Sequence, residues 1–307
     1  MDTHIMALAR KGEVMSNRKD EFARTIRQRI QQLNDLPTLP EAARALLRLR
    51  NDPQAGTQEL ATVVEQDPSL AAQIVRYARL SIFGYGGKVT SVQKAITLVL
   101  GFDMALHMAL GLATGNRLNM PEDGRIGRNA FWRHAVYSAT LMQEFSTAIP
   151  AARRPPAGIT YLAGLLHNLG FVTLSHLAPK EFTLLNQFFS ESGANSTREL
   201  ELQLLGVRHE QLGMWLMQAW GLPEEVIITA REHHYPDYEG HHSTYSKLAL
   251  LADRALARHQ LGDDNNCEMP KEILASLGLT ETWTLAKLEQ LFTISSELDS
   301  LVEQLAA

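Results

Sequence analysis

The sequence predicts an all-α protein built from two helical parts. Apolar residues recur at every third or fourth position along most of the 307-residue chain, which is the spacing of helices buried on one face. Proline, glycine and capping residues mark where these apolar stretches start and end. No stretch requires a β-strand. We therefore expect a helical bundle preceded by a smaller helical subdomain.

The first part is expected to contain short helices. A flexible tail at residues 1–17 precedes an amphipathic helix from Arg18 to Leu33, which Pro37 ends. Pro40 can occupy the first turn of the next helix. Asp67, followed by Pro68, is a candidate N-cap. Further helices are expected over 60–65, 68–78, 92–100 and 104–112; residues 18–116 form the subdomain and 117–128 a polar linker.

The helices of the second part are longer. The stretch Gly158–Pro179 predicts one apolar helix with the polar pair His167 and Asn168 in its middle, and Pro179 is expected to mark its end. The interior face of helix 208–220 is expected to comprise Leu212, Trp215, Leu216 and Ala219. Other helices are predicted over 128–146, 181–190, 199–205, 224–234, 243–259, 271–277 and 285–305. Residues 129–262 would form the core, and 263–307 would add C-terminal helices that pack on it.

Composition excludes several classes of protein. A hydrophobic fraction of 45% and a charged fraction of 21% are ordinary for a globular protein, and a net charge of −5 gives no argument for DNA or an anionic membrane. The single cysteine, Cys267, rules out an internal disulfide and a multi-cysteine zinc site. The most apolar stretch, Ala95–Gly115, is interrupted by Asp103 and His107, so a buried helix pair is expected. We expect a soluble, cytoplasmic protein that interacts with neither DNA nor membrane.

Several polar residues lie on faces that should be apolar. A single inward histidine is usually a satisfied core residue, and each of these positions has such an ordinary explanation. Their order along successive helices is less ordinary, because imidazoles and carboxylates that converge from facing helices form metal sites in helical bundles. The positions are His134, His167 with Asn168, His209, His233 with His234, and Asp253.

The same order resembles the HD superfamily of metal-dependent phosphohydrolases, most closely its HDOD branch, the HD-related output domain of bacterial signalling proteins. The resemblance covers about residues 29–290. The motifs that carry it are LPTLP at 36–40, VVEQDPSLAAQIVRYA at 63–78, SVQKAITLVLG at 91–101, FWRHA at 131–135, LAGLLHNLG at 162–170, WGLP at 220–223 and LALLAD at 248–253.

The chain departs from the catalytic members of this superfamily. They carry a His-Asp pair where this chain has His167-Asn168, and an asparagine has no charge and cannot act as a base. The related HD-GYP enzymes carry a lysine where this chain has Phe171, and their Gly-Tyr-Pro signature is absent. If the pocket holds a metal, the resemblance implies Fe, Mn or Zn bound by His134, His167, His209, His233, His234 and Asp253. The other interpretation, which the departures favour, is a pocket without a cofactor, whose histidines bond one another and water.

These departures favour a non-catalytic signal-transduction output or scaffold domain. It would bind a signalling protein in trans, or a small signal, in a cleft between the two helical parts, with a hinge near residues 116–128. The alternative is a metal-dependent phosphohydrolase that acts on a cyclic dinucleotide or another nucleotide. A third hypothesis is a sensor that binds a nucleotide second messenger without cutting it.

Overall fold

The computed structural model describes residues 21–28, 39–115, 120–191 and 196–306. These residues form helices and connecting loops, with one isolated β-bridge between Ser196 and Asp264 and no strand among them. The all-α prediction is confirmed. The predicted tail at 1–17 lies outside the described residues, as do parts of the first helix and of the linker; residues 21–28 of that first helix are helical.

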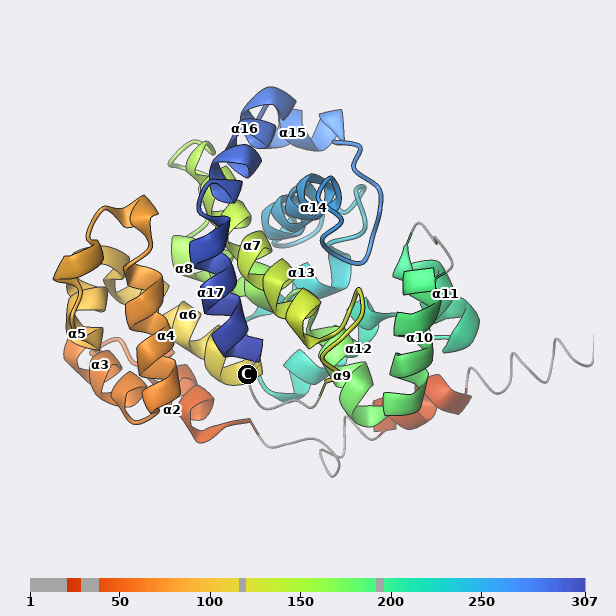
Figure 1. Cartoon of the computed structure of the whole chain (residues 1–307), viewed down its shortest axis with the longest axis horizontal. Helices are drawn as coiled ribbons and strands as arrows, with labels where there is room; N and C mark the ends of the chain where they lie inside the picture. The colour runs from red at the N-terminus through yellow and green to blue at the C-terminus, as the bar shows by residue number, and fades with distance from the viewer. Residues whose placement is uncertain (1–20, 29–38, 116–119, 192–195, 307) are drawn as a thin grey trace, which may run out of the picture.

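The first part is a group of short helices that ends in one long buried helix, α6 (Gly101–Gly115) (Figure 1). The Asp67 carboxylate accepts hydrogen bonds from the backbone amides of Ser69 and Leu70, which confirms the predicted cap. The helix expected over 92–100 is α-helical only at its start and then widens into a π-helix. The preceding elements are α2 (Glu41–Arg50), α3 (Thr57–Glu65), α4 (Pro68–Ala78), α5 (Val92–Lys94) and the π-helical η3 (Ala95–Leu100).

The second part is organised around α7 (Arg128–Thr147) and α8 (Ala157–Leu166), which pack along each other. The other helices of this part surround the pair, and α14, α16 and α17 all contact α7 (Figure 1). They are α9 (Leu169–Leu177), α10 (Pro179–Glu191), α11 (Thr197–Leu204), α12 (His209–Ala219), α13 (Glu224–Glu232), α14 (Ser243–Ala257), α15 (Lys271–Leu277), α16 (Glu281–Phe292) and α17 (Ser295–Ala306).

The long central helix predicted over Gly158–Pro179 is wrong in one respect, because it breaks at His167-Asn168. Asn168 has φ −98° and ψ 16°, outside the helical range, and α9 starts after it. The His167 side chain donates from Nδ1 to the Gly164 carbonyl, at 2.6 Å, which occupies a backbone acceptor at the end of α8. Pro179 begins α10 directly after α9 ends at Leu177. The break therefore places both polar side chains at a helix junction.

The interior faces of two helices test the predicted periodicity. On α7, residues spaced three or four apart are all buried, namely Phe131, His134, Ala135, Ser138, Leu141, Met142 and Phe145. On α12, Leu212 and Leu216 are buried as expected, but Ala219 is exposed and Trp215 only half-buried. The buried stripe of α12 is rotated toward Gly213 and Met217, because α12 packs on both α9 and α13.

The two helical parts share their packing at α6. This helix lies against α8, and a Cβ atom added at Gly111 would come within 2.6 Å of Leu165 and 3.0 Å of Leu162. The C-terminal helix α17 also contacts both parts, through α4 and α7. A surface cavity of about 350 Å³ lies between α4 and α17, lined by Arg76, Arg79, Ser296 and Ser300 among others.

Among the described residues, two helical stretches are long and apolar enough to cross a membrane, Val92–Gly115 and Ala157–Leu177. The most apolar window of each is 61% and 94% buried inside the fold, respectively. Core helices of soluble proteins have this character, so the two stretches are weak evidence for membrane insertion. The fold is compatible with the soluble helical domain that the sequence predicts.

Candidate metal centre

The fold brings all the predicted site residues into one buried cluster in the second part. His134 comes from α7, His167 and Asn168 from the α8–α9 junction, and His209 from the start of α12. His167 links the two halves of the cluster, since its ring lies 5.2 Å from the ring of His134 and 4.9 Å from that of His233. The remaining members are Phe171 on α9, His233 and His234 after α13, and Asp253 on α14.

One half of the cluster is formed by His134, His167 and Asp253. Asp253 Oδ1 lies 3.1 Å from His134 Nε2 and 3.4 Å from His167 Nε2. His167 Nε2 and both Asp253 oxygens are buried without a hydrogen bond of normal geometry among the described residues. Buried polar atoms that lie this close without bonding one another have the arrangement of ligands around a shared ion. Asp253, which on sequence grounds alone also fits a surface pair with an arginine, is only 6% exposed.

The tautomer of His167 is fixed by its surroundings. Its Nδ1 donates to the Gly164 carbonyl, so in the neutral ring the lone pair is on Nε2, which faces Asp253. Burial lowers the pKa of His167, but the charge of Asp253 outweighs this and raises it above its usual value. Burial likewise raises the pKa of Asp253, but His167 and His134 lower it far below the usual range. Asp253 is therefore ionised in the folded protein.

Asn168 contacts His134 rather than solvent. Its Nδ2 donates to His134 Nδ1 at 3.3 Å, and its Oδ1 is buried without a partner. Rotating the carboxamide by 180° would present Oδ1 to the same nitrogen, so Asn168 can serve either tautomer of His134. A carboxylate at this position could only accept. The amide thus orients the His134 ring and adds no charge.

The other half of the cluster is formed by His209, His233 and His234, together with Asp263. His234 Nε2 lies 3.1 Å from Asp263 Oδ2, and His209 Nε2 lies 3.4 Å from His233 Nε2. His233 donates from Nδ1 to the Ala230 carbonyl at 2.9 Å, which leaves its Nε2 free to accept or to ligate. Burial, followed by the charge of His234, lowers the pKa of His233 well below its usual value, so this ring is neutral.

His209 is surrounded by carboxylates. Its Nδ1 lies 3.0 Å from both oxygens of Glu201 on α11, and Glu210 Oε2 is 3.5 Å away. Burial lowers the pKa of His209, but the charges of Glu201 and Glu210 outweigh this and raise it to about 10. Without a metal, His209 is therefore an imidazolium whose second N–H donates to neutral His233. Binding of a metal by His209 and His233 would therefore release a proton.

Asp263, Glu201 and Glu210 were not predicted as site residues. Asp263 lies in the polar loop DDNN after α14, which has no periodicity that would direct a side chain inward. Glu201 is in an alternating Glu-Leu stretch that resembles a solvated helix face, yet it is fully buried. Glu210 follows His209 directly at the start of a helix. This neighbouring pair is the one local sequence feature that could have indicated an acidic residue at the site. The position of Asp263 depends on close packing by its neighbour Gly262. Gly262 has φ 102°, and a Cβ atom on it would lie 2.9 Å from His134 Nε2, so only glycine lets the loop pass this close to His134.

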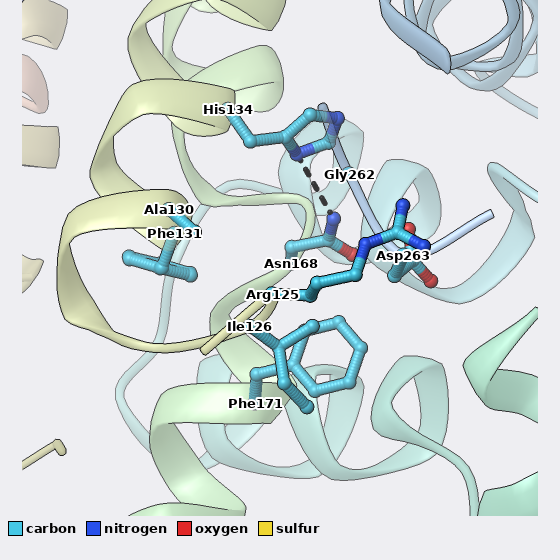
Figure 2. A pocket seen from close by; sticks show the side chains of 9 residues that line it. All are labelled: Arg125, Ile126, Ala130, Phe131, His134, Asn168, Phe171, Gly262 and Asp263. Atoms are coloured by element: carbon cyan, nitrogen blue, oxygen red, sulfur yellow. Dashed lines mark hydrogen bonds between the residues drawn. The ribbon is translucent and has the colours of Figure 1, made fainter. Parts of the chain in front are cut away.

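The cluster is closed to molecules larger than water. His167, His209 and His233 have no exposed surface, and the Phe171 ring stacks on the His209 ring at 4.2 Å. Figure 2 shows the cavity beside His134, which has a volume of about 10 Å³. That is the space of about one water molecule, whereas ligand pockets usually measure about 300–1,000 Å³. The cavity is lined by Arg125, Ile126, Ala130, Phe131, His134, Asn168, Phe171, Gly262 and Asp263.

The residues present fit the metal that the resemblance implies. His134, His167 and Asp253 place one ligand atom each within 4.8 Å of one another, and so do His209, His233 and His234. Carbonyl or carboxylate groups hold the opposite nitrogens of His167, His209 and His233, as outer groups do in metal sites. Imidazole with carboxylate suits Zn, Fe or Mn. Such an ion would supply Lewis acidity and lower the pKa of a bound water.

Comparison with known proteins identifies the family of the chain. The family model for the HDOD domain matches residues 36–236. A sequence relative from Treponema pallidum (strain Nichols), an uncharacterised protein, is 26% identical over 204 residues; these are 66% of this chain and 38% of the relative, so the chain spans well under half of that protein.

Solved structures share the fold. A protein from Marinobacter aquaeolei VT8, whose name proposes a role in signal transduction, superposes with a TM-score of 0.81 at 30% identity, over 94% of this chain and 66% of that one. An HDOD domain protein of unknown function from Geobacter sulfurreducens gives 0.70 at 21% identity, over 92% and 97%. A Shewanella amazonensis SB2B protein, whose name proposes a phosphohydrolase, gives 0.69 at 17%, over 90% and 97%. With the family model matching about two thirds of its length, this chain belongs to the HDOD family.

Proposed function

We propose that this chain is a signal-transduction module that recognises a partner protein or a small signal and does not hydrolyse phosphodiesters. The observation that carries the proposal is the closed pocket: the cavity beside His134 holds about one water molecule, and Phe171 covers the ring of His209. A nucleotide has no route to the histidines in this state. The neutral amide of Asn168 further supports the proposal, because it cannot take a proton from water.

The metal, where bound, has a structural role in this proposal. His134, His167 and Asp253 would hold it from three different helices, which fixes the relative positions of α7, the α8–α9 junction and α14. The chain's own groups orient these ligands: Asn168 positions His134, and the Gly164 carbonyl positions His167. Because metal sites formed only in the native state stabilise that state, removing the ion should lower the melting temperature.

A hydrolysis assay tests the proposal. Purified protein supplied with Mn, Fe or Zn is incubated with a cyclic dinucleotide, and linear product is measured by chromatography. We expect no turnover above that of the His167→Ala variant. The matched control is His241→Ala, which removes an exposed histidine outside the cluster. Turnover that His241→Ala retains and His167→Ala abolishes would overturn the proposal.

A second candidate function is a metal-dependent phosphohydrolase, and Asp263 is the observation that favours it. This carboxylate lies against His234 and His209 and lines the same cavity as Asn168, so the site keeps an acid although position 168 has lost one. The ligands would be His134, His167, His209, His233, His234 and Asp253. Elemental analysis of protein prepared without chelators decides its first requirement: less than about a tenth of an ion per chain would retire this candidate.

A further inference from the structure

The segment Met120–Gly127, here named the cover, closes the histidine pocket on one side. It supplies Arg125 and Ile126 to the cavity wall, alongside Asn168 and Asp263 (Figure 2). Most of the cover is exposed, and Met120, Ile126 and Gly127 are its buried residues. The cover is thus a surface segment whose two ends are buried. Arg125 lies next to one of these buried ends and lines the pocket.

One side chain, Asn186 on α10, holds the middle of the cover. Its Oδ1 accepts from the Ile126 backbone amide at 3.2 Å, and its Nδ2 donates to the Asp123 carbonyl at 2.8 Å. Gly124, at φ 100°, passes so close that a Cβ would lie 2.1 Å from the Asn186 amide. Two hydrogen bonds from one side chain are a modest restraint, because water can replace them once the side chain is removed. Substitution of Asn186 therefore loosens the middle of the cover, while its start stays bonded to α7 through Pro121 and Glu122.

Arg125 is held in a definite orientation with most of its donors uncommitted. Its guanidinium lies over the Phe189 ring at 4.4 Å and donates from Nη2 to Asn265 Oδ1 at 2.9 Å. Among the described residues no carboxylate forms an ion pair with it within 4.0 Å, although Asp263 is near enough to act on its charge. A guanidinium has five N–H donors in a planar fork, so Arg125 can still offer a bidentate pair to an oxyanion.

We propose that Arg125 binds the phosphate group of a small anionic ligand at the mouth of the histidine pocket, and that the cover, which carries Arg125, shifts to admit the ligand. Where the HD-GYP enzymes carry a lysine, this chain has the uncharged Phe171. Arg125 would supply a positive charge in its place, from a different segment of the chain. The inference rests on the proposed function, because it names the small signal that such a module would recognise. The ligand class is a phosphate-bearing molecule, bound and not cut.

The carboxylate of Asp263 does not oppose this binding. It lies 3.1 Å from His234 Nε2 and 3.6 Å from His209 Nε2, so its Oδ2 faces two imidazoles rather than the mouth of the pocket alone. The other nearby acids are also paired, Asp253 with His134 and His167, and Glu210 with Arg198 at 2.6 Å. Arg125 is left as the cation at the cavity with free donors, and neighbouring Asn168 adds a rotatable amide.

Calorimetric titration tests the proposal on the full chain. Inorganic phosphate and a cyclic dinucleotide are titrated separately into wild type, Arg125→Gln, Arg125→Lys and Arg153→Gln. Arg153 is an exposed arginine on a loop, and it serves as the matched control for loss of one charge. We expect Arg125→Gln to raise Kd by about 10- to 100-fold, which is the usual worth of a charge-assisted contact. Arg125→Lys should recover only part of the affinity, since lysine has no fork.

The cover gives an independent measurement. Asn186→Ala removes both restraints on it, so phosphate should bind several-fold more tightly in this variant, and Arg125→Gln should cancel the gain. Circular dichroism checks that each variant is folded. If only the affinity for inorganic phosphate depends on Arg125, the ligand is free phosphate; if only the affinity for the dinucleotide does, the ligand is a nucleotide. Either result supports the inference.

Two results would overturn the inference. One is equal affinity of Arg125→Gln and wild type for both probes, and the other is the absence of binding in both wild type and Asn186→Ala. Either result leaves the proposed non-hydrolytic function intact. Conversely, cleavage of the dinucleotide during the titration, measured as linear product, would defeat the proposed function whether or not Arg125 is needed for binding.

Discussion

At the scale of single residues, the buried cluster is stabilised by charges that compensate one another. Carboxylates and imidazoles are each costly to bury alone, by several kcal/mol, but here every acid lies within ion-pair distance of a histidine or arginine. Asn168 is the neutral member, and it satisfies His134 through a hydrogen bond. The consequence is that protonation of His209 is coupled to folding.

The metal-free protein should lose stability as pH rises toward 10. His209 has a pKa of about 10 in the folded state, against an ordinary value of about 6.5 in the unfolded chain. A raised histidine pKa contributes stability that is fully present below about 6.5 and is lost as pH rises through about 10. Urea midpoints of chelator-treated protein, measured between about pH 7 and about pH 10, should therefore fall.

The variant Glu201→Gln identifies the source of this pH dependence. Without the Glu201 carboxylate the pKa of His209 falls, so the decline in the urea midpoint with pH should become shallower. Glu199→Gln, an exposed glutamate on the same helix, is the matched control and should keep the wild-type slope. Identical slopes for all three proteins would show that His209 does not titrate as described.

At the scale of helices, the site depends on how closely α9 approaches α12. Gly170 on α9 faces the backbone of His209, and a Cβ atom there would lie 1.9 Å from the His209 carbonyl oxygen. Backbone atoms cannot move aside as the end of a side chain can. This contact brings His209 at the start of α12 to the ring of Phe171 and to the cluster.

We therefore expect Gly170→Ala to destabilise the protein by about 1–3 kcal/mol or more, because α9 and α12 must separate. The same change should weaken metal retention, since it displaces His209. The urea midpoint and the elemental content of the purified protein measure these effects. Gly87→Ala is the control, because a Cβ at Gly87 meets no atom within 4 Å. A midpoint for Gly170→Ala equal to that of the control would contradict the close approach.

At the scale of the whole molecule, the two helical parts behave as one packed unit in this structure. The long helix α6 is buried almost throughout, and its neighbours include α2, α3 and α4 on one side and α8 on the other. α17 adds a second connection, because Arg76 on α4 donates to Ser300 at 3.0 Å while Arg133 on α7 contacts Asp299 at 2.8 and 3.1 Å. Loss of the first part should therefore expose the core of the second.

A core substitution in the first part should lower the stability reported from the second. Leu60→Ala on α3 removes a fully buried side chain, at a cost of about 2–5 kcal/mol. All tryptophans of the chain lie in the second part, at positions 132, 215, 220 and 283. We expect the urea midpoint followed by tryptophan fluorescence to fall in Leu60→Ala and to stay unchanged in Leu98→Ala, an exposed position. If the urea midpoint measured by fluorescence is the same in Leu60→Ala as in wild type, the two parts unfold independently.

The sequence by itself determined the helical class, most helix boundaries and the histidines of the site. Those features follow from local rules: apolar periodicity, proline and glycine positions, the Asp67 cap and polar residues placed on apolar faces. The order of the histidines along the chain was enough to predict that they meet, because consecutive helices of a bundle pack on one another.

Only the tertiary structure decided which carboxylates reach the cluster, where the central helix breaks and whether the pocket is closed. Asp263 and Arg125 lie on irregular segments, where no period relates a side chain to the core, and their direction is set by contacts with residues far along the chain. Glu201 is an acidic residue that is nevertheless fully buried, with its carboxylate 3.0 Å from His209 Nδ1. The placement of these side chains depends on charged and polar groups that are far away in the sequence but close in the fold. Local sequence patterns cannot predict such pairs, because the packing of the whole chain brings the partners together.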